Sequence, residues 1–132
     1  ANEQGNSVTA YSLDYQTGQL ALLGSLSTVP DDFYGTSHCA EIKMDPEGWY
    51  LYAPNRGHDS VAVFAVDRES GKLNARASLC MVAEVAQLTS DPDTAVDEES
   101  GEPARFSPQH LAIDPSGQTL YHQSYQEGWI FQ

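Results

Sequence analysis

Few side chains in this sequence could act on an anionic ligand, and they can be followed one by one. Six Lys and Arg residues stand against nineteen Asp and Glu residues, which gives a formal net charge of −13. A surface of this sign opposes anionic small molecules, so such a ligand needs a local cluster of the few cations. The same charge repels nucleic acid and anionic lipid, and we expect neither a nucleic acid nor a membrane as a partner.

A histidine and a cysteine stand side by side at His38 and Cys39, the residue types of a thiol–imidazole nucleophile. Neighbouring residues of a strand point to opposite faces of the sheet, which argues against such a pair. Cys39 and Cys80 are better explained as free, partly buried thiols than as a disulfide. His110 and His122 lack the spacing of zinc ligands, so we expect no metal site.

The stretch 84–102 holds seven acidic residues and no basic one. This composition indicates a solvated loop between two sheets, and we predict an acidic loop over 81–108. Asp91 and Asp93 are also spaced for a calcium loop, but Ala95 stands where an EF-hand needs a ligand. The solvated loop is therefore the favoured interpretation, and the calcium site stays open as the alternative.

Two units of sequence repeat along the chain. The segment 7–20 recurs as 60–73, an offset of 53 residues (60 − 7). The unit within 40–52 recurs within 110–121, an offset of 69 residues (121 − 52). Each unit joins two short runs of Val, Ile, Leu, Tyr and Phe through Asp-Pro-x-Gly or Asp-x-x-Ser/Thr-Gly, which are turn sequences. The pattern predicts antiparallel strands joined by hairpins.

These hairpins predict an all-β fold. A four-stranded sheet of about 50 residues that packs between copies of itself is the blade of a β-propeller. The run 61–66 is apolar without strict alternation, as in a strand covered on both faces. We predict strands near 7–14, 19–27, 39–45, 49–55, 60–67, 72–80, 109–114, 118–123 and 128–132.

The chain therefore holds about two and a half blades of antiparallel four-stranded sheets. Residues 1–28 end one blade, 39–80 form a full blade, 81–108 form the acidic loop between blades, and 109–132 form a partial blade. Propellers need about four blades or more to close, so this chain cannot close one. Further blades of the same protein, or other chains, must complete it.

Several motifs cover nearly the whole chain except the acidic loop: Asn2-Glu3, Ala40-Glu41-Ile42, Asp45-Pro46-x-Gly48, Leu51-Tyr52, Asn55-Arg56-Gly57-His58-Asp59-Ser60, Gly101-x-Pro103-x-Arg105-Phe106 and Ile113-Asp114-Pro115-x-Gly117. Together they resemble the motifs of the seven-bladed lactonase propellers. That family includes bacterial 6-phosphogluconolactonase of the propeller type and fungal 3-carboxy-cis,cis-muconate cyclase.

The resemblance implies a cofactor-free active site at the central channel of a seven-bladed propeller, acting on a small anionic lactone. It implies that Glu3 is the catalytic acid or base, and that Arg56 acts with it and binds the phosphate or carboxylate of the substrate. The spacing supports the pairing, because 56 − 3 is again 53 and both residues take the same place in consecutive blades. Arg105 and His58 are further candidates for binding the substrate.

We therefore expect hydrolysis of a sugar lactone, with 6-phosphogluconolactone as the leading substrate, in the complete propeller and not in this chain alone. One alternative is a lactonising cycloisomerase of the muconate type, because residues 126–129 are similar to the fungal cyclases. Another is a non-catalytic blade module for binding or assembly, in which Glu3 and Arg56 form a structural ion pair. No signal peptide is visible at the start, and we expect a cytoplasmic protein.

Overall fold

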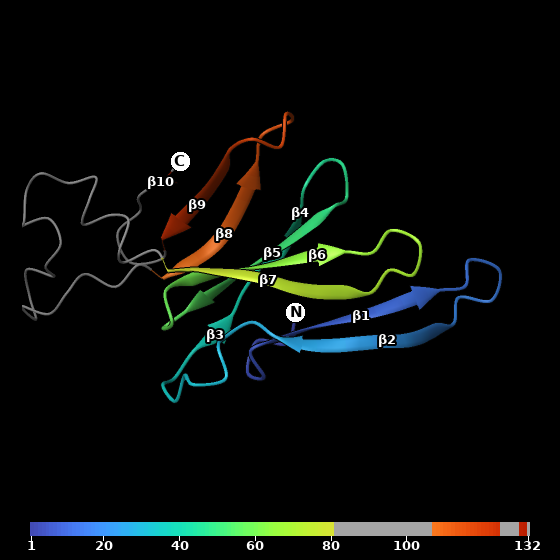
Figure 1. The fold of residues 1–132 in the computed structure, drawn as a ribbon, viewed down its shortest axis with the longest axis horizontal. Helices are drawn as coiled ribbons and strands as arrows, with labels where there is room; N and C mark the ends of the chain where they lie inside the picture. The colour runs from blue at the N-terminus through green and yellow to red at the C-terminus, as the bar shows by residue number, and fades with distance from the viewer. Residues whose placement is uncertain (81–106, 125–129, 132) are drawn as a thin grey trace, which may run out of the picture.

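The computed structural model describes residues 1–80, 107–124 and 130–131, and every regular element in these ranges is a β-strand (Figure 1). The all-β prediction is confirmed. The strands are β1 (Ser7–Leu13), β2 (Leu20–Ser27), β3 (His38–Cys39), β4 (Lys43–Met44), β5 (Tyr50–Arg56), β6 (Ser60–Val66), β7 (Leu73–Cys80), β8 (Pro108–Ile113), β9 (Leu120–Ser124) and β10 (Ile130–Phe131).

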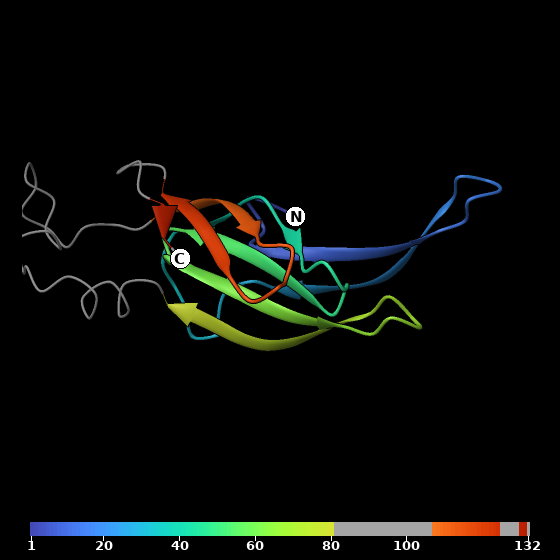
Figure 2. The same ribbon diagram turned by 90° about the horizontal axis from the view of Figure 1, so that it is seen from above.

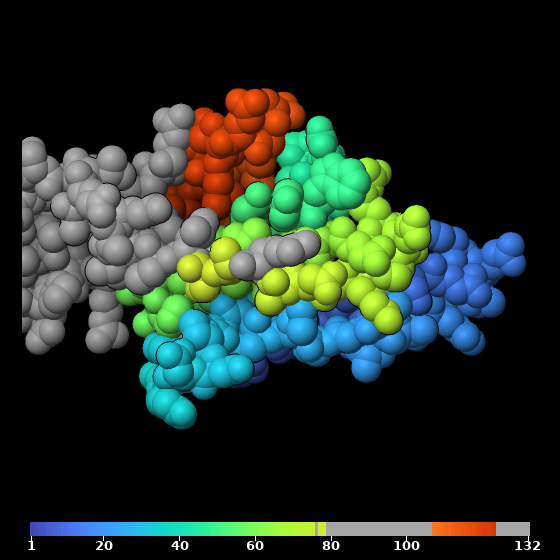
Figure 3. All heavy atoms as spheres, in the orientation of Figure 1, coloured from blue at the N-terminus to red at the C-terminus, as the bar shows by residue number. Residues whose placement is uncertain are grey.

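The strands form three antiparallel sheets. The first is the hairpin β1–β2, the second has the order β3–β5–β6–β7 with β4 also paired to β5, and the third has the order β10–β9–β8. In the space-filling view the sheets appear as adjacent bands, from blue through green and yellow to orange (Figure 3). The middle sheet is therefore a four-stranded unit whose innermost strand consists of two short pieces, β3 and β4.

The continuous strand predicted over 39–45 is wrong, because the chain leaves the ladder between β3 and β4. The amide of Ala40 still donates to the carbonyl oxygen of Pro54 in β5, at 2.9 Å. Pro54 has no N–H with which to return the bond, so the pair is only half made. The next amide, that of Glu41, donates instead to the carbonyl oxygen of Gln109 in β8, at 3.4 Å.

The turns repeat with the strands. The side chains of Asp14 and Asp67 each accept hydrogen bonds from the amides two and three residues further on, the nearer ones at 2.8 and 3.0 Å. Gly18 and Gly71 close these turns at φ values of 73° and 72°, a conformation that glycine adopts without strain. Both pairs of residues are 53 apart, so the repeat predicted from the sequence is present in the backbone.

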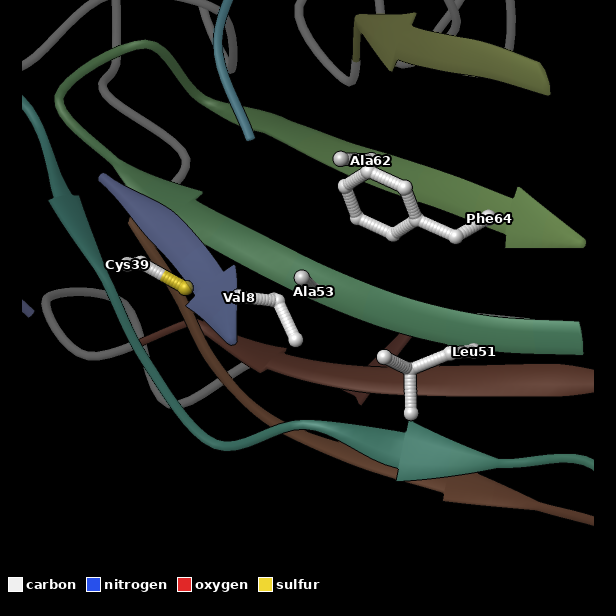
Figure 4. Packing of buried hydrophobic residues seen from close by; sticks show 6 residues of the cluster. All are labelled: Val8, Cys39, Leu51, Ala53, Ala62 and Phe64. Atoms are coloured by element: carbon white, nitrogen blue, oxygen red, sulfur yellow. The ribbon is translucent and has the colours of Figure 1, made fainter. Parts of the chain in front are cut away.

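The apolar core lies between the first hairpin and the middle sheet (Figure 4). Its buried members come from β1, β3, β5 and β6, and are Val8, Cys39, Leu51, Ala53, Ala62 and Phe64. Val61 is also fully buried but lies outside this cluster, and successive strand residues point to opposite faces. Because β8 contacts β4 and β5, we assign it to that other face (Figure 2). Strand β6 thus has buried side chains on both faces, Val61 on one and Ala62 and Phe64 on the other, which agrees with its apolar run.

Phe64 is the largest fully buried side chain among the described residues, with 1% of its surface exposed. We expect Phe64→Ala to lower the free energy of unfolding by about 3–5 kcal/mol, because it leaves a cavity between the two sheets. Tyr15→Ala is the control, since the Tyr15 side chain is 91% exposed in the first hairpin turn. Guanidinium denaturation of the two variants measures the difference, and a loss below about 1 kcal/mol for Phe64→Ala would contradict this packing.

Candidate functional site

Two equivalent turns carry Glu3 and Arg56. Each turn runs from an Asn to a Ser that pairs with it, as Asn2 with Ser7 and Asn55 with Ser60. Asn6 and Asp59 hold the same place in the two turns, with φ values of 43° and 52°, and they are the non-glycine residues with positive φ in the described ranges. The offset of 53 therefore describes the local geometry of both turns and not only their sequence.

The side chains of Glu3 and Arg56 meet. The Nη2 group of Arg56 donates a hydrogen bond to Oε1 of Glu3, and the two side chains form an ion pair. Arg56 is the more enclosed partner, with 25% of its side chain exposed against 59% for Glu3. The proximity expected from the repeat is found, and it is compatible with a substrate site as well as with a structural ion pair.

The innermost strand holds this pair in place. Arg56 ends β5 and stands opposite His38 of β3 in the register of the two strands. The amide of Cys39 points away from β5 and donates to the carbonyl oxygen of Glu3, at 3.2 Å. The backbone of β3 therefore lies between Arg56 and Glu3, and the arginine side chain reaches across it.

Two nitrogen atoms in this region lack partners. Nδ1 of His38 and Nε of Arg56 are buried and make no hydrogen bond within the described residues. A buried polar atom without a partner costs about 1–3 kcal/mol, so such atoms are rare in folded proteins and mark places where function or water intervenes. The site thus retains hydrogen-bonding capacity beside the ion pair.

A buried hydrogen-bond network fixes the turn that carries Arg56. Oδ1 of Asn55 accepts a hydrogen bond from the hydroxyl of Thr28 at 2.7 Å. The side-chain NH2 group of Asn55 donates to the carbonyl oxygen of Thr28 at 2.7 Å and to Oγ of Ser60 at 3.2 Å. Ser60 Oγ also lies 2.6 Å from Nδ1 of His58, within hydrogen-bonding distance. Phe33 packs edge-on against this imidazole, at 4.6 Å between ring centres.

Gly57 allows the connection before β3 to approach the Arg56 turn closely. Its φ of 97° lies in the region that favours glycine, and a Cβ atom here would stand 2.4 Å from the carbonyl oxygen of Thr36. Any other residue would have to displace that backbone or the turn itself. The glycine of the Asn-Arg-Gly motif thus has a packing reason to be where it is.

A second charged cluster lies further along the inner strands. Oε1 of Glu41 accepts from Nζ of Lys43 at 2.8 Å, and its Oε2 lies 3.3 Å from Nδ1 of His110 in β8. Hydrogen bonds from Lys43 and then from His110 hold the pKa of Glu41 below its usual value. The sequence analysis did not identify this contact. The signal was available, because 110 − 41 is 69, the offset of the second repeat.

The remaining candidates are apart from these clusters or outside the described residues. Arg105 and the calcium alternative lie outside them, as does the predicted acidic loop up to residue 106. Cys39 is a free, buried thiol, and burial raises its pKa, which argues further against a nucleophile. Within the described ranges no group of three metal-ligating side chains occurs, and no helix is suited to cross a membrane.

Comparison with known families decides the assignment of this fold. Residues 1–83 match the family model described as lactonase, seven-bladed β-propeller. The chain belongs to this family. Its three sheets are therefore blades of a lactonase-type propeller, which is the fold class that the sequence motifs predicted.

Relatives in the lactonase family include a 6-phosphogluconolactonase of Bacillus subtilis (strain 168), 38% identical over 71 residues, which cover 54% of this chain and 20% of that protein. An uncharacterised protein of Lactococcus lactis subsp. cremoris (strain MG1363) is 37% identical over 71 residues, covering 54% of this chain and 21% of that protein. The matched residues thus span about a fifth of the length of these curated relatives.

Solved structures agree on the fold. A protein from Lactobacillus plantarum superposes with a TM-score of 0.64 at 24% identity, covering 98% of this chain and 35% of its own. A periplasmic gluconolactonase of Pseudomonas aeruginosa gives a TM-score of 0.65 at 20% identity, covering 98% and 33%. The lactonase-family chain described here therefore corresponds to about a third of such a propeller.

The burial of Cys39 predicts a thiol of low reactivity. A raised pKa leaves little thiolate at neutral pH, and only 1% of the residue is exposed, so Ellman's reagent should react about tenfold or more slowly than with an unfolded chain. A variant whose sole cysteine is Cys39 isolates the signal. Guanidinium should release reaction of one full thiol, and fast reaction in the native protein would contradict the burial.

Proposed function

We propose that the propeller containing this chain hydrolyses a sugar lactone, with 6-phosphogluconolactone as the leading substrate. The observation that carries this proposal is the contact between Glu3 and Arg56, two residues that occupy the same place in consecutive blades. Membership of the lactonase family and the 6-phosphogluconolactonase among its relatives support the choice of reaction.

In this proposal Arg56 binds the anionic substituent of the substrate. A guanidinium group carries five N–H donors in a planar fork that matches a phosphate or a carboxylate. One of these donors is used on Glu3, and others are free to turn to the ligand. His58 and Arg105 remain candidates for further contacts to the substrate, the first on the same turn as Arg56.

Glu3 acts as the catalytic base in the proposed reaction. One carboxylate oxygen accepts from Arg56, whereas Oε2 makes no hydrogen bond to the described residues and 59% of the side chain is exposed. This oxygen takes a proton from water as the water attacks the lactone carbonyl carbon. The ring carbon–oxygen bond then breaks, and the departing ring oxygen takes up a proton to give the hydroxy acid.

The complete site needs the blades that this chain lacks. Since the chain covers about a third of the solved relatives, most of the channel wall comes from further blades of the same protein or from other chains. We expect the chain alone to be inactive. No cofactor enters the proposed reaction, and the cytoplasmic location stays a prediction.

Two other functions stay open as predictions. A lactonising cycloisomerase of the muconate type would use Glu3 to move a carbon-bound proton, but residues 126–129, on which that likeness rests, lie outside the described residues. A non-catalytic blade module would use the Glu3–Arg56 contact for assembly only. Assay of the complete propeller with both lactones and muconates separates the three.

Substitution of the two residues tests the proposal in the complete propeller. We expect Arg56→Ala to raise KM for 6-phosphogluconolactone about 10-fold or more, because a charged contact to the substrate is lost. Glu3→Gln should lower kcat about 100-fold or more, since the base is lost while its shape is kept. Arg68→Ala is the matched control, because Arg68 stacks on Trp49 away from the site.

The two outcomes of that assay are distinct. Losses in both variants, with the control near wild type and all melting temperatures similar, would support the assigned roles. Unchanged kcat and KM in both variants would reduce Glu3 and Arg56 to a structural ion pair.

The mass of the mature polypeptide tests where the missing blades come from. The 132 residues account for 14.4 kDa, and a propeller completed within one chain predicts a considerably larger intact mass. Mass spectrometry of the protein purified from its source measures it directly. A mass of 14.4 kDa combined with a defined dimer or trimer on size exclusion would instead indicate completion by several chains.

A further inference from the structure

The inner edge of the middle sheet meets both neighbouring blades. Two amides on this edge point away from β5: that of Cys39 bonds the carbonyl oxygen of Glu3 at 3.2 Å, and that of Glu41 bonds the carbonyl oxygen of Gln109 at 3.4 Å. Residues two apart along an extended chain are separated by about 7 Å. The preceding blade and the following blade therefore contact the same edge at two points about 7 Å apart. The second point of contact, at Glu41, lies next to the ion pair of Glu3 and Arg56.

That neighbouring site holds a carboxylate and an imidazole. Nδ1 of His110, the residue after Gln109, lies 3.3 Å from Oε2 of Glu41, and Lys43 bonds the other carboxylate oxygen at 2.8 Å. An ionised carboxylate only accepts hydrogen bonds, so Nδ1 carries a proton whether the imidazole is neutral or charged. Nε2 is therefore the atom of His110 that gains and loses a proton, and the imidazole is 56% exposed.

We infer that His110 is the catalytic residue that donates a proton to the departing ring oxygen of the lactone, and that Glu41 is the residue that positions it. This inference rests on the proposed lactone hydrolysis. A carboxylate that orients one ring nitrogen while the other transfers a proton is a recurring arrangement in hydrolytic sites. The charged groups against His110 within the described residues are Glu41 and, through it, Lys43.

The proton balance of the reaction calls for two groups. Glu3 takes a proton from water as the new carbon–oxygen bond forms at the carbonyl carbon. The ring carbon–oxygen bond breaks, and the Nε2 proton of the His110 imidazolium passes to the departing oxygen. Glu3 then loses its proton to solvent and His110 regains one, so the net change is addition of one water to the lactone. The backbone contacts that hold Glu3 and Gln109 are about 7 Å apart along the edge, so both groups belong to the same stretch of it.

A purely structural role explains the pair less well. Salt bridges between exposed side chains contribute little to stability, and all three members here are at least 40% exposed. Removal of His110 or Glu41 should therefore leave the melting temperature nearly unchanged. A large loss of turnover in a variant of normal stability would then report chemistry.

The test uses the complete propeller and 6-phosphogluconolactone. We expect His110→Gln to lower kcat about 100-fold with KM changed less than about 3-fold, because a general acid acts on the transition state. Added imidazole should restore part of the turnover of His110→Ala. Glu41→Gln, which keeps the shape but loses the charge, should lower kcat about 10-fold. Glu69→Gln is the matched control, since Glu69 lies exposed in the turn before β7.

Each result has one meaning. If Arg56→Ala and Glu3→Gln lose hydrolysis but kcat of His110→Gln stays within about threefold of wild type, the role of His110 is wrong and the proposed function is still supported. If wild-type propeller hydrolyses no lactone, both fall. If His110→Gln loses turnover while imidazole restores none in His110→Ala and Glu41→Gln is unchanged, the loss is structural and the inference is overturned.

Discussion

The arrangement depends on the inner edge of the middle sheet, where the chain leaves the β-ladder between β3 and β4. Backbone amides alternate in direction along a strand. The amide of Ala40 therefore bonds Pro54 within the same sheet, whereas the amides of Cys39 and Glu41 bond the neighbouring blades. Pro54 cannot return its bond, which lets the chain depart from the ladder after Ala40. The same edge thus binds the preceding blade through the amide of Cys39 and the following blade through the amide of Glu41. These two contacts set the spacing between the Glu3–Arg56 ion pair and the cluster around Glu41.

Buried contacts beside this edge position the side chains that it carries. The core around Phe64 binds the middle sheet to the first hairpin, and Asn55 ties the end of β5 to Thr28 of the connection that follows that hairpin. A buried amide with three hydrogen bonds permits one turn geometry, because any other geometry leaves polar atoms without partners. Arg56 follows Asn55 directly, so its backbone is fixed while its side chain stays at the surface of the site.

The sequence predicted what the repeat determines locally. The offset of 53 predicted that Glu3 and Arg56 share a position, and the aspartate–glycine turns near Asp14 and Asp67 formed as their residue types indicate. The interruption of the strand over 39–45 was missed because it depends on a residue of the neighbouring strand. Pro54 has no backbone N–H and cannot donate a hydrogen bond to Ala40. Such an effect acts between neighbouring strands, so the residue pattern of the interrupted strand alone does not predict it.

The contact of Glu41 with His110 was missed for a different reason. An insertion of 16 residues (69 − 53) separates the second repeat from the first, so the two offsets did not suggest one rule for inner-strand positions. Residue type at such positions is also free to vary while the backbone repeats. A strand pattern therefore predicts which residues share a place in successive blades, and only coordinates show whether their side chains reach one another.

The charge of the chain bears on how substrate and product would bind in the proposed reaction. With a formal net charge of −13, the chain repels anions, and the cations Arg56 and Lys43 are each engaged by a carboxylate. An anionic lactone must therefore bind through directed donors, because no strongly positive field attracts it. Hydrolysis turns the neutral lactone group into a second anion, which the same charges repel more strongly. In the proposed reaction the acidic surface would thus bind the product more weakly than the substrate, which favours release after ring opening.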